Sequence, residues 1–360
     1  MVLLEHEAKA LLASAGVPVP PGVVVDDPAA PIPLAPPVVV KAQVPAGGRG
    51  KAGGVRPAAT EAEARAHVRA LLGSTLLGHP VRRVLVEAAR PGGREAYLAI
   101  LLDRAARGPV LLASAAGGVD VEAAADRLAL PIHPFVGIQP YAIRRVSAHL
   151  GAAVGPIVEA LWRCFTRHEC ELVEVNPLAL GRGGEAVALD AKLVVDDRAR
   201  ARHPELPPGD GLLDPLEAAG ARLGVYPVRM AGAIAVATTG AGQLMATLDC
   251  VAALGGTLAG GLDLGGVVGH RPAELAEALG LLHAFAPRVI LLNSYVRTWK
   301  NDVIAEALLA ALGRGADRRA TVVRMAGHRA PEGAALLRRA GVPVAPSLVE
   351  ACRLAVAAAR

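Results

Sequence analysis

From about residue 231 onward, the chain alternates regularly between short apolar runs and longer segments with helical spacing of apolar residues. Consecutive parallel strands need a crossover connection, which is usually a helix, so this alternation predicts a parallel sheet flanked by helices. The predicted strands lie within 231–242, 288–293 and 320–325, and the predicted helices span 242–254, 272–286, 301–313, 331–340 and 347–359.

The first half of the chain is less regular. An amphipathic helix is expected at 3–15, because Leu4, Ala8, Leu11 and Leu12 share a face and Gly16 can end it. Residues 170–180 and 186–196 read as two strands of a hairpin around 181–184. Further strands are predicted at 36–44, 82–89, 95–103 and 109–118, and helices at 60–72 and 149–166.

Residues 197–213 lack periodicity and contain Pro and Gly, which is typical of a linker. A chain of 360 residues is long for one core, so we expect two domains, 1–210 and 211–360. With 53% hydrophobic but only 2% aromatic residues, both cores should be built from Ala, Val and Leu.

Composition argues against several classes of protein. The net charge is +5 and the basic residues are scattered, so we expect no nucleic-acid partner. The four cysteines have no metal-ligand spacing, and the ten histidines form no cluster and are expected to be mostly solvated. No apolar stretch suits a membrane span and the N-terminus does not read as a signal peptide, so a cytoplasmic location is expected.

A glycine-rich stretch, Gly47–Gly54, follows the strand at 36–44. It contains a formal G-x-G-x-x-G, but no helix opens at its last glycine, so it fails the context of a dinucleotide site. It is not a Walker A loop either, since no Ser or Thr follows Lys51. Two interpretations remain: a flap that closes over phosphates, or a mobile surface turn.

Charged residues within or beside the apolar strands are further candidates. Lys41 must either reach solvent or meet an anion, because burying an unpaired ammonium is costly. Glu87 and Glu95 flank a loop between strands, where a carboxylate is usually solvated but can also contact a nucleoside.

Glu174, Asn176 and Asp190 lie in the two strands of the predicted hairpin. A carboxylate and an amide carbonyl that pairing brings together suit Mg²⁺, which takes few protein ligands. The alternative is that Asn176 starts a turn and Asp190 pairs with Lys192. In the second domain, residues 238–242 join a strand to a helix, which can make an anion site or an ordinary tight turn.

Together these motifs resemble the β subunits of succinyl-CoA synthetase and of the related malate–CoA ligases, over nearly the whole chain. The most specific segments are KAQVPAGGRGKAGG and the pair EVNPL and LDAKL, with VLVEAA, SAAGGVDVE, GAGQLMATLD, GLDLGG and NDVIAEALLAAL in the same order. The resemblance implies an α/β chain with an ATP-grasp domain followed by a flavodoxin-like CoA-ligase domain. Such a chain works with a separate CoA-binding α subunit that carries a phosphohistidine, in an αβ or α2β2 assembly.

The resemblance also implies roles for single residues, with Mg²⁺ and ATP, or GTP, as cofactors. Phosphates would be held by Lys41, Gly48, Arg49 and Gly50, the nucleoside by Glu87 and Glu95, and Mg²⁺ by Asn176 and Asp190, while Glu174 would face the phosphohistidine. The acyl substrate would lie near Thr239, Gly240 and Arg297.

Two segments depart from the family pattern. Thr239 stands where the family has Asn, and 293–299 (NSYVRTW) replaces a glycine-rich loop whose amides bind a carboxylate. Arg297 offers a charged alternative, so we expect an acid other than succinate. The alternative is that Arg297 and Trp299 point outward, into solvent or a subunit interface, and that the acyl site is degenerate. A stand-alone ATP-grasp carboxylate ligase and a non-catalytic regulatory paralogue are the competing interpretations.

Overall fold

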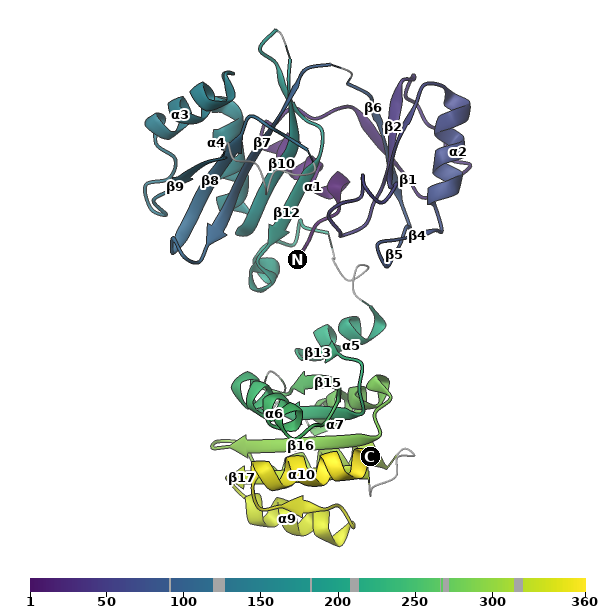
Figure 1. Cartoon of the computed structure of the whole chain (residues 1–360), viewed down its shortest axis with the longest axis vertical. Coiled ribbons are helices and arrows are strands. Elements are labelled where there is room, and N and C mark those ends of the chain that lie inside the picture. The colour runs from purple at the N-terminus through teal and green to yellow at the C-terminus, as the bar shows by residue number, and fades with distance from the viewer. Residues whose placement is uncertain are drawn as a thin grey trace. The chain divides into compact units, whose positions relative to one another are not determined.

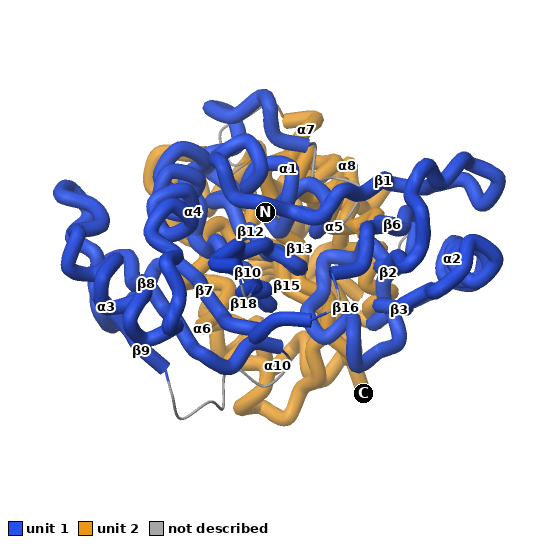
Figure 2. Tube along the Cα trace, turned by 90° about the horizontal axis from the view of Figure 1, so that it is seen from above, with its two compact units in different colours: residues 1–212 blue, residues 213–360 orange. Residues whose placement is uncertain are grey.

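The computed structural model describes residues 1–90, 92–118, 127–181, 183–207, 214–265, 267, 272–313 and 320–360. The chain divides into two compact units, residues 1–212 and 213–360 (Figure 2). The predicted boundary between 210 and 211 lies outside the described residues. Each unit has its own hydrophobic cores.

The first unit contains a four-stranded antiparallel sheet in the order β1-β6-β2-β3. Its strands are rich in valine, which suits a pleated, buried surface. One helix, α2, begins after Thr60, whose hydroxyl accepts a hydrogen bond from Glu63 N, and packs its apolar residues against this sheet. The elements are β1 (Gly22–Val25), β2 (Val38–Ala42), β3 (Val55–Ala58), α2 (Glu61–Leu71) and β6 (Val84–Ala88), with a small ribbon of β4 (Thr75–Leu76) and β5 (His79–Pro80).

A second antiparallel sheet has the order β11-β10-β7-β8-β9, with β12 also paired to β10. Helices α3 and α4 cover one of its faces (Figure 1). The elements are β7 (Arg94–Asp103), β8 (Gly108–Ser114), β9 (Arg127–Pro131), α3 (Pro140–Leu150), α4 (Gly155–Arg167), β10 (Cys170–Leu180), β11 (Ala186–Ala188) and β12 (Ala191–Val195).

Helix α1 (Glu5–Ser14) lies between the two sheets (Figure 1). Ala8 and Leu12 pack into the core of the second sheet. Glu5 and Lys9 are one helical turn apart and form side-chain contacts with strands β2 and β6 of the first sheet. The helix therefore joins the two sheets through an apolar and a charged contact.

The strands and helices predicted for this unit are confirmed, with two differences. The hairpin is present, but its second strand is divided into β11 and β12, which both pair with β10. The helix expected at 149–166 corresponds to α4, but its predicted start is too early. Gly151, with φ 58°, ends α3, which the sequence analysis missed, and α4 begins at Gly155.

The expected linker is partly structured. Residues Asp197–Arg202 form the 3₁₀ helix η2, and Leu206 is buried in the core of the first unit. The remainder of the predicted linker, 208–213, lies outside the described residues.

The second unit contains one six-stranded sheet in the order β13-β15-β14-β16-β17-β18. The last five are parallel in a 2-1-3-4-5 order, which is the flavodoxin-like arrangement that the family resemblance implied. Three of these strands, β14, β16 and β17, were predicted, whereas the antiparallel edge strand β13 and the parallel strands β15 and β18 were not. The elements are α5 (Pro215–Leu223), β13 (Tyr226–Arg229), β14 (Ile234–Thr238), α6 (Ala241–Ala253), β15 (Leu258–Asp263), α7 (Pro272–Gly280), η4 (Leu281–Phe285), β16 (Val289–Val296), α8 (Asn301–Leu312), β17 (Thr321–Gly327), α9 (Ala330–Arg339), β18 (Val344–Ala345) and α10 (Leu348–Ala359).

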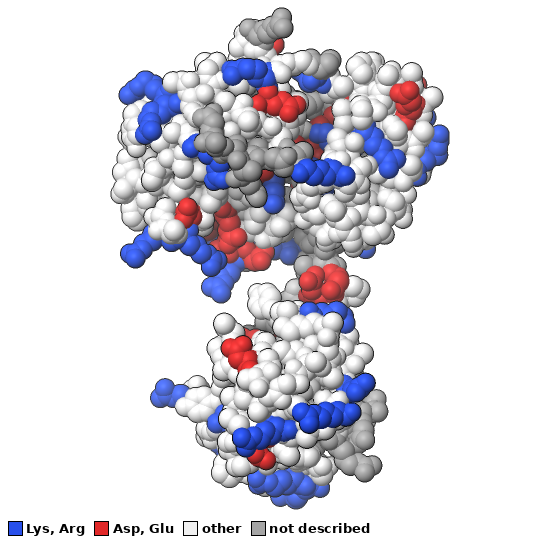
Figure 3. Space-filling view, viewed as in Figure 1, with Lys and Arg blue, Asp and Glu red and all other residues white. Residues whose placement is uncertain are grey.

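Among the described residues, no helix is both long and apolar enough to cross a bilayer. On the face of the first unit shown in Figure 3, basic and acidic side chains are interspersed.

Candidate nucleotide site and acyl site

A cavity of about 530 Å³ lies in the first unit between the sheet of β2 and β6 and the ends of β10 and β12. This volume is typical of sites for small ligands. Its wall includes Glu5 of α1 and Lys51 of the glycine-rich stretch. It also includes eight of the site residues predicted from the sequence: Lys41, Gly48, Arg49, Gly50, Glu87, Glu174, Asn176 and Asp190.

Lys41 is buried on β2, only 7% exposed, and forms ion pairs within the chain. Its Nζ lies 2.8 Å from Glu5 Oε1 and 2.8 Å from Glu87 Oε2, and it donates to the carbonyl of Leu189. Lys9 repeats this pattern from α1, with Nζ 2.8 Å from Glu5 Oε1 and 2.6 Å from Glu87 Oε1. Lys41 therefore does not reach solvent, and the alternative of a solvated Glu87 is wrong, since that carboxylate is 3% exposed.

Arg49 extends the network to the opposite wall of the cavity. Its Nη2 lies 2.8 Å from Glu5 Oε2 and donates to both Asp190 carboxylate oxygens at 2.8 and 2.9 Å. Its Nη1 donates to the carbonyl of Ala42 at 3.0 Å. The alternative that Asp190 serves as the partner of Lys192 is not supported by this geometry, because the Asp190 carboxylate binds Arg49.

The mutual contacts shift the pKa values of these groups. Burial alone would raise the pKa of Glu5, but Lys41, Lys9 and Arg49 hold it below its ordinary value of 4.5. Burial would lower the pKa of Lys41, and Glu5 and Glu87 raise it above 10.5. For Lys9, burial and the charge of Lys41 outweigh the effect of Glu5 and Glu87, so its pKa is lowered. Burial, followed by the charge of Glu5, raises the pKa of Asp190.

We expect Glu5→Gln to destabilise the chain at neutral pH and this deficit to shrink as the pH falls below about 4.5. A glutamate in the unfolded chain takes up a proton near that pH, whereas folded Glu5 stays ionised. The contribution of Glu5 to the free energy of unfolding is therefore at its full value above pH 4.5 and is lost as the pH falls toward the folded pKa. Chemical denaturation of both proteins from pH 7 to 3 measures the difference. Exposed Glu159→Gln serves as the control, and a deficit independent of pH would contradict the shift.

The glycine-rich stretch forms a series of turns along the cavity. Gly48 has φ 76°, and a Cβ placed on Gly47, Gly48 or Gly50 would meet no atom within 4 Å. The stretch is fixed at its base, where Ala42 N donates to Gly54 O at 2.7 Å. Open space above the glycines leaves their backbone accessible to a ligand, as the flap interpretation requires.

Asn176 and Asp190 are brought together by the hairpin, since Asn176 N donates to Asp190 O at 3.3 Å. Asn176 Oδ1 accepts from Gly118 N at 2.7 Å, and the Asp190 side chain is about one-third exposed to the cavity. An amide oxygen and a carboxylate on one cavity wall are oxygen donors of the kind that Mg²⁺ prefers. The donor set therefore fits this ion.

Glu174 lines the first cavity and also a second one, of about 680 Å³, on the exposed face of β7, β8 and β10. Asn176 and Lys192 are likewise shared by both, so the two cavities adjoin at these residues. Glu95 is exposed at the start of β7, next to Gly118, and is not among the described residues that line either cavity.

In the second unit, β14 and β16 lie side by side at the point where the strand order reverses. Ligands of such sheets bind beyond the carboxyl ends of the strands at this point. Thr239 and Gly240 follow β14, and Gly240 is the N-cap of α6, with open space around the position of a Cβ. Thr239 Oγ1 accepts from Tyr295 N at 3.1 Å and lies 3.0 Å from Gln243 Oε1, so it links the two strand ends.

The segment 293–299 is only partly a loop. β16 continues to Val296, and Asn293 is buried, donating to Thr247 Oγ1 at 2.9 Å. Arg297 follows the strand and is exposed, and Trp299 is 36% exposed. Both long side chains therefore lie at the surface of this unit, on the segment that follows β16.

Sequence reasoning did not identify Glu5 and Lys9 as part of the site. The two residues are spaced i, i+4 on a helix, which is also the spacing of ordinary surface pairs. Their distinguishing sign is that they lie on the same side as the buried Ala8 and Leu12. A charged pair next to the apolar face of a helix indicates a buried ionic contact.

The sequence of this chain is similar to those of known proteins. A family model described as an ATP-grasp domain matches residues 2–180. The succinate–CoA ligase [ADP-forming] β subunit of Pelobacter propionicus is 39% identical, over 96% of this chain and 93% of its own length. The protein of the same name from Ignicoccus hospitalis is 37% identical over the full length of both. The chain belongs to the family of ADP-forming succinate–CoA ligase β subunits.

Membership in this family makes the chain an acid–CoA ligase β subunit with an ATP-grasp domain. Among solved structures, ATP citrate lyase from Methanothrix soehngenii, in complex with citrate and coenzyme A, is similar with a TM-score of 0.74 over 99% of each chain. The sequence identity is 19%, so this likeness concerns the fold.

Proposed function

We propose that this ligase β subunit binds Mg-nucleotide in the cavity of its first unit and transfers the terminal phosphoryl group to a histidine of a separate CoA-binding α subunit. The observation that carries the proposal is the cavity itself. It combines two buried cations, Lys41 and Arg49, an open glycine-rich backbone and the oxygen donors of Asn176 and Asp190.

The formal charges of the network are balanced, with Lys9, Lys41 and Arg49 opposite Glu5, Glu87 and Asp190. An incoming triphosphate would compete for Lys41 and Arg49, and Glu5 would keep both side chains oriented toward the cavity. Asn176 and Asp190 would hold Mg²⁺, which neutralises charge on the transferring phosphoryl group. Glu87 and Glu95 would contact the nucleoside, which we take to be that of ATP or GTP.

Glu174 is the residue we assign to the acceptor histidine. It lies where the two cavities adjoin, so a histidine loop entering through the second cavity would meet the carboxylate beside the phosphate site. A carboxylate near an imidazole orients the ring and stabilises its charged form. The phosphohistidine would then carry the group to the acyl substrate, which divides one difficult transfer into two.

We expect acyl-CoA formation only from the complex. The isolated chain with Mg-ATP, CoA and a panel of carboxylic acids should give none, and addition of its α subunit partner should give acyl-CoA and ADP. Thioester formation is measured by chromatography, and the phosphorylated subunit is identified by mass spectrometry. Robust synthesis by the isolated chain would favour a stand-alone ligase, and phosphate incorporation by neither protein would favour a regulatory paralogue.

We further propose that the acyl group binds at the switch point of the second unit, near Thr239, Gly240 and Arg297. The forked guanidinium of Arg297 takes the place of glycine amides there, which favours an acid other than succinate. The same acid panel with Arg297→Gly tests this assignment. Succinate as the best substrate, undiminished in the variant, would contradict it.

A further inference from the structure

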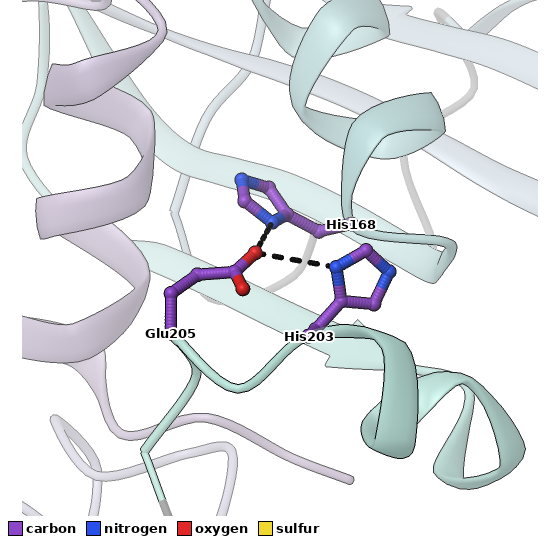
Figure 4. Close-up of side chains that lie close together, drawn as sticks. All are labelled: His168, His203 and Glu205. Atoms are coloured by element: carbon purple, nitrogen blue, oxygen red, sulfur yellow. Dashed lines mark hydrogen bonds and ion pairs between the residues drawn. The ribbon is translucent and has the colours of Figure 1, made fainter.

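Three side chains of the first unit, His168, His203 and Glu205, point toward one another (Figure 4). His168 follows the last residue of α4, and His203 and Glu205 follow η2. Glu205 Oε1 lies 3.5 Å from His168 Nδ1 and 3.2 Å from His203 Nδ1. One nitrogen or oxygen from each residue lies within 4.8 Å of the other two.

His168 is not solvated, contrary to the expectation for most histidines. It is 4% exposed, and its Nδ1 is buried without a hydrogen bond. The 3.5 Å separation from Glu205 is at the outer limit and lacks hydrogen-bond alignment. A buried ring nitrogen without a hydrogen bond is costly, and a metal ion bound by this atom, Glu205 and His203 would supply the missing partner.

His203 is held by a second carboxylate. Its Nε2 lies 3.1 Å from Glu169 Oε1, and Arg202 holds the same carboxylate through Nη2. Glu169 adopts a left-handed conformation with φ 49°, which is unfavourable for a residue other than glycine. Metal-binding histidines usually donate their other ring N–H to a carboxylate, which fixes the tautomer and leaves the first nitrogen free to coordinate.

We propose that His168 Nδ1, His203 Nδ1 and a Glu205 carboxylate oxygen form a site for a divalent transition metal, with Zn²⁺ as the best fit. Two imidazoles and one carboxylate are a common zinc ligand set, and the fourth position takes water. The site is separate from the proposed Mg²⁺ site, which has oxygen donors only.

Two of the three separations between the ligand atoms agree with tetrahedral zinc. For metal–ligand bonds of about 2.0–2.1 Å, two ligand atoms of a tetrahedron lie about 3.3–3.4 Å apart. The two separations from Glu205 Oε1, 3.5 and 3.2 Å, are close to this value. The buried His168 and the Glu169 contact leave little to rearrange when the ion enters.

Zinc at this position would fix the segment that begins the connection between the units. His203 and Glu205 come from that segment, and Leu206 anchors it in the core of the first unit. His168 belongs to the α4–β10 junction. A metal bond to all three would attach the connection to the first unit at residue 205, and the ion would have a structural role.

The test uses the untagged full chain, freed of metal by chelation and titrated with Zn²⁺ by calorimetry. We expect one ion per chain with a Kd of about 1 µM or tighter. Saturation should raise Tm by about 5 °C. Co²⁺ should give the intense visible absorption of a tetrahedral site, and millimolar Mg²⁺ should not compete, because Mg²⁺ prefers oxygen ligands.

His203→Ala and Glu205→Gln should each weaken Zn²⁺ binding by about 10-fold or more while the apo protein keeps its circular dichroism. His283→Ala, which removes an exposed histidine of the second unit, is the matched control and should bind as the parent does. The proposal is overturned by any of three results: no saturable Zn²⁺ binding, undiminished binding in both site variants, or displacement by Mg²⁺.

Discussion

Lys41→Ala is expected to lower both the affinity for Mg-nucleotide and the stability of the chain. Loss of a charge-assisted contact to phosphate should weaken binding by about 1–3 kcal/mol, roughly a 10- to 100-fold rise in Kd. Removing a buried partner of Glu5 and Glu87 should cost about 3 kcal/mol in the free energy of unfolding. Calorimetry with Mg-ATP and chemical denaturation measure the two effects, with binding measured at a temperature where the variant is folded.

Lys9→Ala is the matched comparison. Lys9 contacts the same two carboxylates, but it is not among the described residues that line the cavity. We therefore expect a similar loss of stability and a much smaller change in nucleotide affinity. If the two variants bind nucleotide equally well, Lys41 is only part of the ionic network and its assignment as a phosphate ligand fails.

The parallel sheet of the second unit was predictable because its strands form short apolar runs separated by helices. Once the connections between parallel strands are assigned as helices, few sheet topologies remain possible. The edge strand β13 was missed because Tyr226–Arg229 carries no clear alternation and is largely exposed. Its position depends on pairing with β15, which a local pattern cannot show.

The first unit was harder to predict, because its sheets are antiparallel and their order depends on long-range pairing. The helix expected at 149–166 begins only at Gly155, and this later start was signalled by Gly151 and by Pro156 in the first turn of α4. Both signs are present in the sequence.

Only part of the candidate site was predicted. The predicted residues are close in sequence, whereas the missed ones are brought together from distant segments. Asn176 and Asp190 lie on neighbouring strands of a hairpin, so pairing alone indicates that they meet. Glu5 and Arg49 lie on segments that only the packing of α1 between the sheets brings together. His168 and His203 were missed for the same reason, because 35 residues and a β-hairpin separate them.

Asp190→Asn should raise the Mg²⁺ requirement and slow phosphoryl transfer much more than it weakens nucleotide binding. The substitution keeps the shape of the side chain and an oxygen that can accept from Ala191 N, but it removes the charge of one proposed metal ligand. We expect the Mg²⁺ concentration for half-maximal rate to rise by about 10-fold or more, and transfer to the α subunit to fall by about 100-fold.

The contact between Asp190 and Arg49 complicates this test and decides its controls. Asp190 also binds Arg49, so a lower rate could come from a displaced guanidinium, but only loss of a metal ligand makes the rate recover at high Mg²⁺. Lys192→Met removes the partner that the alternative interpretation gave to Asp190, and it should leave the Mg²⁺ requirement unchanged. An Asp190→Asn protein with the parent's Mg²⁺ dependence would show that Asp190 orients Arg49 and does not hold the ion.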